Sequence, residues 1–376
     1  MKFFKRIMLI LVSIIIVIVL AIIIFFRTAP QIGGSPFGDR LERMKSSPNF
    51  NDGKFQNTVE TKMEMSFADV RKTLAHYLFA DKSDKSPKES IQVKPFNATE
   101  FASLSDSIAF TWLGHSTVLF RINGVTILAD PVIIGERASM FSFMGPKRFD
   151  YSHHIKLEEL PEIDAVILSH DHYDHLDYHT IRGLKDRVDR FFLPLGVGAH
   201  FEAWGIPAEN ITELNWWDEI TFNGVKLAFT PTRHFSGRGF ADRYKTLWGS
   251  WVLIGNNQRI YFSGDSGYFP GFKEIGEKYG PFDLTFMECG AYNESWSEIH
   301  MFPEETARAH LDVKGKLLVP IHWGKFDLAL HPWKESVNRL AKKAEVEGIE
   351  LFTPEVGELN VLSESNDTEL WWNKVD

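Results

Sequence analysis

The sequence predicts an α/β fold with a layered sheet core, preceded by one transmembrane helix. Three observations lead to this prediction. From residue 108 onward, short apolar strands alternate with helical patterns, which is typical of α/β domains. A cluster of histidines follows one of these strands directly, within residues 169–177. Residues 7–26 form an uncharged run of twenty residues, which is long enough to cross a bilayer as a helix.

The N-terminal apolar run is expected to remain in the protein as a membrane anchor. Three basic residues precede it and Arg27 follows it, so the positive-inside bias places the N-terminus in the cytoplasm. A cleaved signal peptide is the alternative. Its apolar core is usually shorter, and residues 27–30 offer no clear cleavage site. We therefore expect residues 1–27 to form a single-pass anchor, with the rest of the chain on the non-cytoplasmic side.

Residues 28–105 are predicted to be a lead-in that spaces the domain from the membrane. They are rich in turn-forming sequences such as 51–53 and 82–88. One helix is expected near residues 67–79, and one strand near 58–65.

Composition excludes one class of partner. The chain has 41 Lys and Arg against 50 Asp and Glu, a net charge of −9, and no basic run interleaved with aromatic residues follows residue 6. A nucleic-acid partner is therefore not expected. The single cysteine, Cys289, cannot form an internal disulfide, and its apolar neighbours predict a buried position.

The domain itself is predicted to open with a β-meander. Residues 108–113 and 117–122 are strand patterns, and Asn123-Gly124, a dipeptide preferred in two-residue hairpin turns, joins them to 125–129. A buried strand follows at 165–168. The other expected strands are residues 191–194, 225–230, 248–254, 258–262, 284–287 and 317–321, and the expected helices are residues 178–187, 272–279, 303–311 and 333–347.

The loop after strand 165–168 carries candidate metal ligands. Imidazole nitrogens and carboxylate oxygens together suit a first-row divalent ion, zinc above all, with manganese or iron as alternatives. Side chains two residues apart on an extended segment point the same way, so His170 and His172 can converge on one ion. Asp174 and His175 follow after the chain has turned, and they can serve a second ion nearby.

Three later strands also end in a candidate ligand. Four strand ends that converge on one point are the arrangement by which a rigid scaffold holds a metal centre. The three further candidates are His234 after 227–230, Asp265 after 260–262 and His322 after 317–321.

The order of these residues resembles the motifs of the metallo-β-lactamase superfamily. Additional sequence strings resemble the family of N-acylphosphatidylethanolamine-hydrolysing phospholipases D. The resemblance runs from about residue 108 to 358, so we expect a hydrolase domain at 106–362 and a polar tail at 363–376. The strings are TWLGHST at 111–117, MGPKRF at 144–149, LWGSW at 247–251, GAY at 290–292 and IHWG at 321–324.

The resemblance implies an αβ/βα sandwich with two zinc ions per chain and a specific assignment of residues. It implies that Tyr173 and His300 contact the substrate, and we expect Asp174 and His300 to be catalytic. For the metals, it implies His170, His172 and His234 on one ion, Asp174, His175 and His322 on the other, and Asp265 as the bridge.

The expected activity is hydrolysis of a phosphodiester by water that two divalent ions activate, with no side-chain nucleophile. The resemblance implies an N-acylphosphatidylethanolamine substrate, cleaved to phosphatidic acid and N-acylethanolamine. His300 is the best candidate to contact the phosphate or to protonate the leaving group. An alternative keeps the fold and metals but takes a small soluble substrate, such as a sugar-phosphate lactone or another phosphodiester. A non-catalytic zinc scaffold is disfavoured, because structural zinc sites are usually rich in cysteine.

Several other assignments stay open at this stage. His115 can line the site or be a buried, satisfied histidine, and Asp171 or Asp177 can orient a ligating histidine. Ser266 within GDSG is a weak candidate for a serine nucleophile. A homodimer is an arrangement that the sequence leaves open. Candidates for an apolar pocket mouth at the membrane are Phe141, Phe143, Met144, Trp216, Trp217, Trp371 and Trp372.

Overall fold

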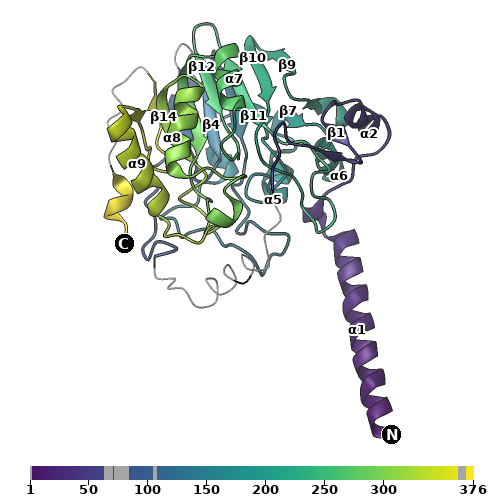
Figure 1. Ribbon diagram of the computed structural model, residues 1–376. Coiled ribbons are helices and arrows are strands. Elements are labelled where there is room, and N and C mark those ends of the chain that lie inside the picture. The colour runs from purple at the N-terminus through teal and green to yellow at the C-terminus, as the bar shows by residue number, and fades with distance from the viewer. Residues whose placement is uncertain (1, 63–70, 72–83, 105–107, 363–369) are drawn as a thin grey trace.

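Two seven-stranded sheets pack face to face, with helices on both outer faces. The computed structural model describes residues 2–62, 71, 84–104, 108–362 and 370–376. Figure 1 shows helices α7, α8 and α9 in front of the strands and the long helix α1 leaving the domain on its own. The predicted α/β sandwich fold is confirmed, including the apolar N-terminal helix.

The N-terminal sheet has the strand order β16-β3-β4-β5-β6-β7-β8. The predicted meander forms its antiparallel part, and β5 to β8 then run parallel. Its strands are β3 (Ala109–Trp112), β4 (Val118–Ile122), β5 (Val125–Ala129), β6 (Ile163–Ile167), β7 (Val188–Pro194), β8 (Ile211–Leu214) and β16 (Asn360–Val361).

The C-terminal sheet has the order β15-β14-β13-β12-β11-β10-β9. Strands β9 to β12 are antiparallel neighbours, and β12 to β15 run parallel. Its strands are β9 (Glu219–Phe222), β10 (Val225–Thr230), β11 (Ser250–Ile254), β12 (Arg259–Phe262), β13 (Phe282–Glu288), β14 (Gly315–Ile321) and β15 (Glu350–Leu351).

Side-chain alternation divides the apolar residues into three clusters, as the period of a strand requires. Ile260 and Phe262 on β12 point into the space between the sheets, whereas Tyr261 packs under the helices of the outer face. The inter-sheet cluster is the largest of the three and includes an edge-to-face group of phenylalanines. Cys289 is buried and free, as predicted.

The helices lie on the outer faces of the sheets or against their ends. Three of the four helices expected in the domain keep their limits to within two residues, but the helix expected at 178–187 ends at Leu184. The domain helices are α5 (Tyr178–Leu184), α6 (Gly198–Ala203), α7 (Gly271–Lys278), α8 (Pro303–Asp312) and α9 (Glu335–Glu347), with short 3-10 helices at Leu157–Glu159, Ala208–Asn210, Glu294–Trp296 and Trp371–Lys374.

His310 on α8 makes stability depend on pH. It is buried, and its Nδ1 lies 2.7 Å from the Thr285 hydroxyl. Burial lowers the pKa of His310 to about 4, below the value of about 6.5 in an unfolded chain. The neutral, buried His310 therefore contributes in full to the free energy of unfolding above pH 6.5. This contribution decreases by about 3 kcal/mol as the pH falls to 4. We expect the stability difference between the wild type and His310→Gln to shrink by that amount between pH 7 and pH 4 in denaturant titrations. Parallel pH curves for the two proteins would contradict this.

The described lead-in residues lie along the surface of the domain. Arg40 donates to Glu213 on β8 at 2.9 Å and to Glu202 on α6 at 2.7 Å, and Phe55 is fully buried in the inter-sheet cluster. The lead-in elements are a 3-10 helix at Pro30–Ile32, α2 (Gly38–Lys45), β1 (Phe50–Asn51), β2 (Lys54–Phe55) and α4 (Ala98–Ser103).

Two expectations for the lead-in have different outcomes. Residues 58–62 are not a strand. They run along the surface of the domain. Here the Glu60 carbonyl and the Thr61 hydroxyl accept hydrogen bonds from the side chain of Arg233 rather than from the backbone of a neighbouring strand. The helix expected near 67–79 lies outside the described residues, apart from residue 71.

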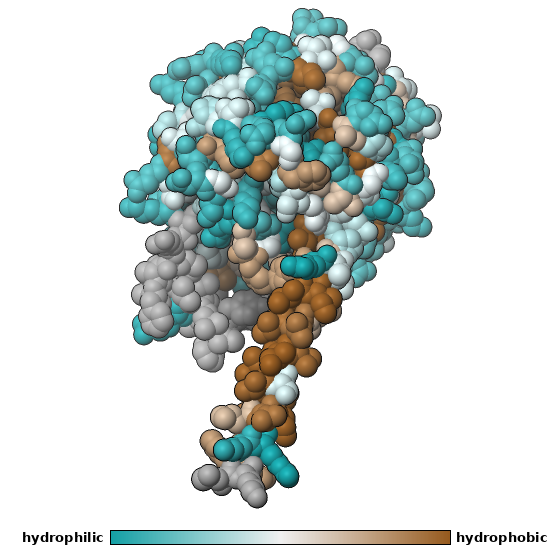
Figure 2. Space-filling view, turned by 90° about the vertical axis from the view of Figure 1, so that its right-hand side faces the viewer, coloured by the Kyte–Doolittle hydropathy of each residue, from teal (hydrophilic) through white to brown (hydrophobic). Residues whose placement is uncertain are grey.

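Helix α1 (Lys2–Thr28) stands clear of the described part of the domain and meets it near the C-terminal end of the helix. Residues 3–28 have a mean hydropathy of 3.7 in their most apolar window, and none of that window is buried. Figure 2 shows this apolar stem below the largely hydrophilic domain. At the junction the Phe25 ring stacks on Phe141 at 5.0 Å between centroids, and Phe26 packs on Phe240 at 5.1 Å.

Candidate metal centre

Six strands deliver polar side chains to one edge of the molecule. Strands β12, β13 and β14 are parallel, and β10 points the same way because both it and β12 are antiparallel to β11. The parallel strands β5 and β6 of the other sheet end beside them. The six residues are Asp130 after β5, His170 after β6, His234 after β10, Asp265 after β12, Glu288 at the end of β13 and His322 after β14.

Three histidines form the first group of candidate ligands, as predicted from the sequence. The Nδ1 atom of His172 lies 2.9 Å from Nε2 of His170 and 3.3 Å from Nε2 of His234. The Nδ1 of His234 lies 2.9 Å from the carbonyl oxygen of Ile299 and donates to it, so its Nε2 is left with a lone pair toward the group. Burial lowers the pKa of His172 to about 4, and it lowers the pKa values of His170 and His234 well below the ordinary value of a histidine. Neutral imidazoles that face one another in this way suit a cation.

The second group contains Asp174, His175 and His322. One oxygen of Asp174 lies 3.4 Å from Nε2 of His175 and 3.1 Å from Nε2 of His322. Burial opposes a charge on His322, but Asp265 and Asp174 raise its pKa to about 10. This nitrogen therefore holds a proton between two carboxylates, and a bound metal ion would displace it.

Asp265 lies between the two groups. Its Oδ2 is 3.0 Å from Nε2 of His322, 3.1 Å from that of His175, and 3.8 Å from those of His170 and His234. The other oxygen, Oδ1, is buried and has no hydrogen-bond partner among the described residues. An unpaired carboxylate oxygen in such a place costs free energy, so the seven side chains fit a centre that holds metal ions.

Asp130 orients His175, a candidate ligand of the second group, and it was not predicted from the sequence. It lies 2.6 Å from Nδ1 of His175 and accepts hydrogen bonds from the backbone and hydroxyl of Ser169. Asp171 and Asp177, which the sequence suggested for orienting a ligating histidine, have other partners. Asp171 pairs with His200 and Thr246, and Asp177 caps helix α5.

Asn57 of the lead-in supports the backbone of a candidate ligand. The side-chain amide of Asn57 donates to the carbonyl of His234 at 2.9 Å, and its oxygen accepts from the His234 backbone N–H at 3.1 Å. This pair of hydrogen bonds fixes the backbone of a candidate ligand from 177 positions away in the sequence.

His115, left open by the sequence, lies at the centre as an additional histidine. Its Nε2 is 2.9 Å from Asp174, and its ring is 4.1 Å from that of His322. His115, Asp130 and His322 all have positive φ angles, of 56°, 42° and 67°, a backbone strain that clusters at functional sites. Gly290 has to be a glycine, because a Cβ there would lie 1.6 Å from the carbonyl oxygen of His322.

A cavity of about 310 Å³ opens over the candidate centre. Its floor includes His172, Asp174, Asp265, His300 and His322. Two cations, Lys62 and Arg243, and the apolar residues Phe235, Trp296, Ile299 and Leu328 form its walls.

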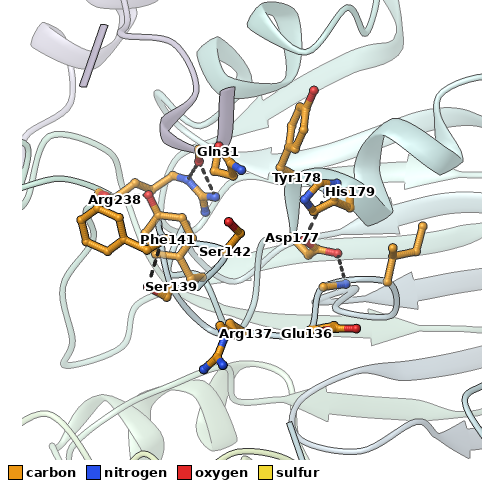
Figure 3. Close-up of a pocket in the computed structure, with 13 residues that line it drawn as sticks. Gln31, Glu136, Arg137, Ser139, Phe141, Ser142, Asp177, Tyr178, His179 and Arg238 are labelled. Atoms are coloured by element: carbon orange, nitrogen blue, oxygen red, sulfur yellow. Dashed lines mark hydrogen bonds between the residues drawn. The ribbon is translucent and has the colours of Figure 1, made fainter. Parts of the chain in front are cut away.

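Tyr173 lies among the candidate ligands of the loop after β6 but lines a second cavity, of about 330 Å³. Its hydroxyl donates to the carbonyl of Arg238 at 2.7 Å, and its ring lies under the Arg238 guanidinium at 4.0 Å. Figure 3 shows Arg238 reaching the backbone of Gln31, with Phe141 on the same side of this cavity. The predicted substrate contact of Tyr173 stays a prediction.

Two suggestions from the sequence are wrong. Trp216, Trp371 and Trp372 are buried in the inter-sheet cluster and Trp217 packs against it, so none of them forms an exposed pocket mouth. Ser266 is not a nucleophile, because its buried hydroxyl bonds the backbone of Arg233 and Gly267.

Comparison with known proteins shows the family of this chain. Residues 126–323 match a family described as the beta-lactamase superfamily domain. The chain belongs to the metallo-β-lactamase superfamily. A protein of Mycobacterium tuberculosis that is described as uncharacterised is 42% identical over 318 residues, which cover 84% of each chain. The N-acyl-phosphatidylethanolamine-hydrolyzing phospholipase D 1 of Caenorhabditis elegans is 37% identical over 296 residues, which cover 74% of this chain and 82% of the worm protein.

A solved structure of a metallo hydrolase has the same fold. The metallo hydrolase Igni18 of Ignicoccus hospitalis aligns with a TM-score of 0.53 at 20% identity, over 68% of this chain and 98% of its own. Superfamily, relatives and the His/Asp cluster together identify the chain as a metal-dependent hydrolase.

Proposed function

We propose that the protein is a membrane-anchored, zinc-dependent phosphodiesterase that cleaves N-acylphosphatidylethanolamine to phosphatidic acid and N-acylethanolamine. The observation that carries this proposal is the position of Asp265 between two groups of candidate metal ligands. A centre of this kind suits in-line displacement at phosphorus. The relatives named as phospholipases of this specificity support the choice of substrate.

The proposed metal ligands are those expected from the sequence. His170, His172 and His234 would hold one zinc ion, Asp174, His175 and His322 the other, and Asp265 both. Bound zinc would supply a water of lowered pKa as the nucleophile and charge to stabilise the phosphoryl oxygens.

The remaining residues of the cavity suit an anionic lipid headgroup. His300 is half-buried beside His322, with their rings 5.2 Å apart, and is proposed to contact the phosphate or protonate the leaving group. Lys62 and Arg243 add positive charge at the wall, which favours a negatively charged substrate. The apolar wall of Phe235, Trp296 and Leu328 suits the hydrocarbon next to the headgroup.

Helix α1 is proposed to be the anchor, with the domain on the non-cytoplasmic side. Its last two phenylalanine rings pack on loops that carry Phe143 and Phe240, which are 75% and 79% exposed. Exposed aromatic residues next to a membrane span suit the interfacial layer of the bilayer. In this orientation the second cavity, with Phe141 and Tyr173, also lies next to the membrane.

The decisive experiment is hydrolysis of N-acylphosphatidylethanolamine in detergent micelles by the full chain supplied with zinc. We expect release of both phosphatidic acid and N-acylethanolamine. The double variant His170→Ala, His172→Ala should lose at least about 1,000-fold in rate, because it removes two of the three nitrogens of the first group. The products are measured together by mass spectrometry.

The matched control is His153→Ala, His154→Ala, which changes two neighbouring histidines in an exposed loop. It should keep full activity. If the wild type binds two zinc ions but leaves the lipid intact and hydrolyses bis(4-nitrophenyl) phosphate, the substrate is a small phosphodiester and the lipid assignment is wrong.

A further inference from the structure

Glu288 is a fully buried carboxylate beside the candidate centre. It ends strand β13, and none of its surface is exposed. One oxygen, Oε2, lies 2.8 Å from Nδ1 of His300, and the other accepts a hydrogen bond from the backbone N–H of Met301 at 2.7 Å. The carboxylate therefore holds both the ring of His300 and the backbone of the residue after it.

The backbone of Glu288 is fixed on both sides. Its N–H donates to the hydroxyl of Ser263 at 3.0 Å, and its carbonyl accepts from the hydroxyl of Thr306 at 2.8 Å. Ser263 follows β12 and Thr306 belongs to α8, so strand, loop and helix all position this residue. A side chain held in this way is a rigid support for a partner that must keep one orientation.

Burial of the Glu288 carboxylate costs free energy of desolvation, and the packing of the core does not require a charged side chain at this position. Burial raises the pKa of Glu288, and His300 only partly offsets that effect. A glutamine of the same shape would fill the same volume without a charge to desolvate. A carboxylate that points at the ring of a histidine next to the reacting centre is, by contrast, the usual means of fixing a ring orientation and tautomer.

We propose that Glu288 is a positioning residue that binds Nδ1 of His300 and so presents Nε2 of His300 to the substrate phosphate. The ring has only two nitrogens, and the bond to Glu288 commits one of them. The ring itself lies in contact with those of His234 and His322, with centroids 5.0 Å and 5.2 Å away. Rotation of the ring would therefore break the bond to Glu288.

This inference rests on the proposed function, because it needs a phosphate-bearing substrate. The test is a double-mutant cycle of Glu288→Gln and His300→Ala on the zinc-loaded full chain. Glu288→Gln alone should lower kcat by on the order of 10- to 100-fold, with KM changed less. In the His300→Ala background the same change should cost about twofold or less, because the residue it acts through is gone. Both single variants should keep two zinc ions and the melting temperature of the wild type within a few degrees.

Glu304→Gln is the control, since Glu304 is a carboxylate on α8 that pairs with Arg339. It should leave kcat unchanged. Equal losses from Glu288→Gln with and without His300, full activity of Glu288→Gln, or loss of zinc in that variant would each overturn the proposal.

The same cycle can be separated from the lipid assignment. It is run in parallel on bis(4-nitrophenyl) phosphate and on binding of inorganic phosphate to the zinc-loaded protein by calorimetry. If the lipid is not hydrolysed, the proposed substrate fails. The positioning role of Glu288 is then decided by whether the two substitutions are non-additive in these two measurements.

Discussion

Asp265→Asn should lower kcat on a phosphodiester by about 1,000-fold or more and reduce the zinc content below two ions per chain. The Asp265 carboxylate lies within 3.8 Å of four histidine nitrogens from both ligand groups. The asparagine removes the negative charge that would balance two divalent ions, and it replaces one oxygen by an amide that repels them. Activity assays and elemental analysis of the same preparation measure both effects.

Asp283→Asn is the matched control for this substitution. Asp283 lies near the opposite end of β13, where it pairs with Lys316 at the surface. Its variant should keep zinc and activity. An Asp265→Asn protein with two zinc ions and more than a tenth of the wild-type rate would mean that this carboxylate does not bridge the ions.

Phe286→Ala should destabilise the fold by about 3–5 kcal/mol, because it leaves a large cavity between the sheets. Phe286 is fully buried, and its ring meets Phe110 edge-on at 5.2 Å and Phe120 at 4.9 Å. The two sheets are held together here by side chains from β3, β4 and β13, so no single loop can collapse into the gap.

Guanidinium unfolding of the full chain in detergent, followed by tryptophan fluorescence, measures this loss. Phe286→Leu keeps most of the volume and should cost less than about 2 kcal/mol. Val346→Ala on the exposed side of α9 should change stability by less than about 0.5 kcal/mol. A Phe286→Ala protein as stable as Phe286→Leu would show that the inter-sheet core repacks.

The regular elements could be predicted because their signals are local. Asn123-Gly124 fixes the hairpin between β4 and β5, and strand 125–129 appears with the predicted limits. The helix after the metal-binding loop ends three residues early at Leu184, because periodicity continues into residues that the structure uses as a turn before β7. The position of the Trp371-Trp372 pair was predicted wrongly, since an aromatic pair near a terminus is as typical of a surface as of a core.

The candidate ligands could be predicted from their order along the chain, but their supports could not. Asp130 is 45 positions from His175, and Asn57 is 177 positions from His234. Such pairs are set by the packing of the two sheets and of the lead-in on the domain, which no local pattern encodes. Glu288 is closer in the sequence to its partner, only twelve positions before His300. Its position at the end of a buried strand was the only signal that could have marked it.

The two hydrogen bonds between Asn57 and His234 limit how this enzyme can be reused. A gene fusion or a domain transplant that takes only the region shared with the superfamily, which begins at residue 126, leaves Asn57 behind. Such a transplant would carry all seven candidate ligands, and one of them would lie on an unsecured backbone. The catalytic unit is therefore not modular at the boundary that sequence similarity suggests, and any portable version has to begin before Asn57.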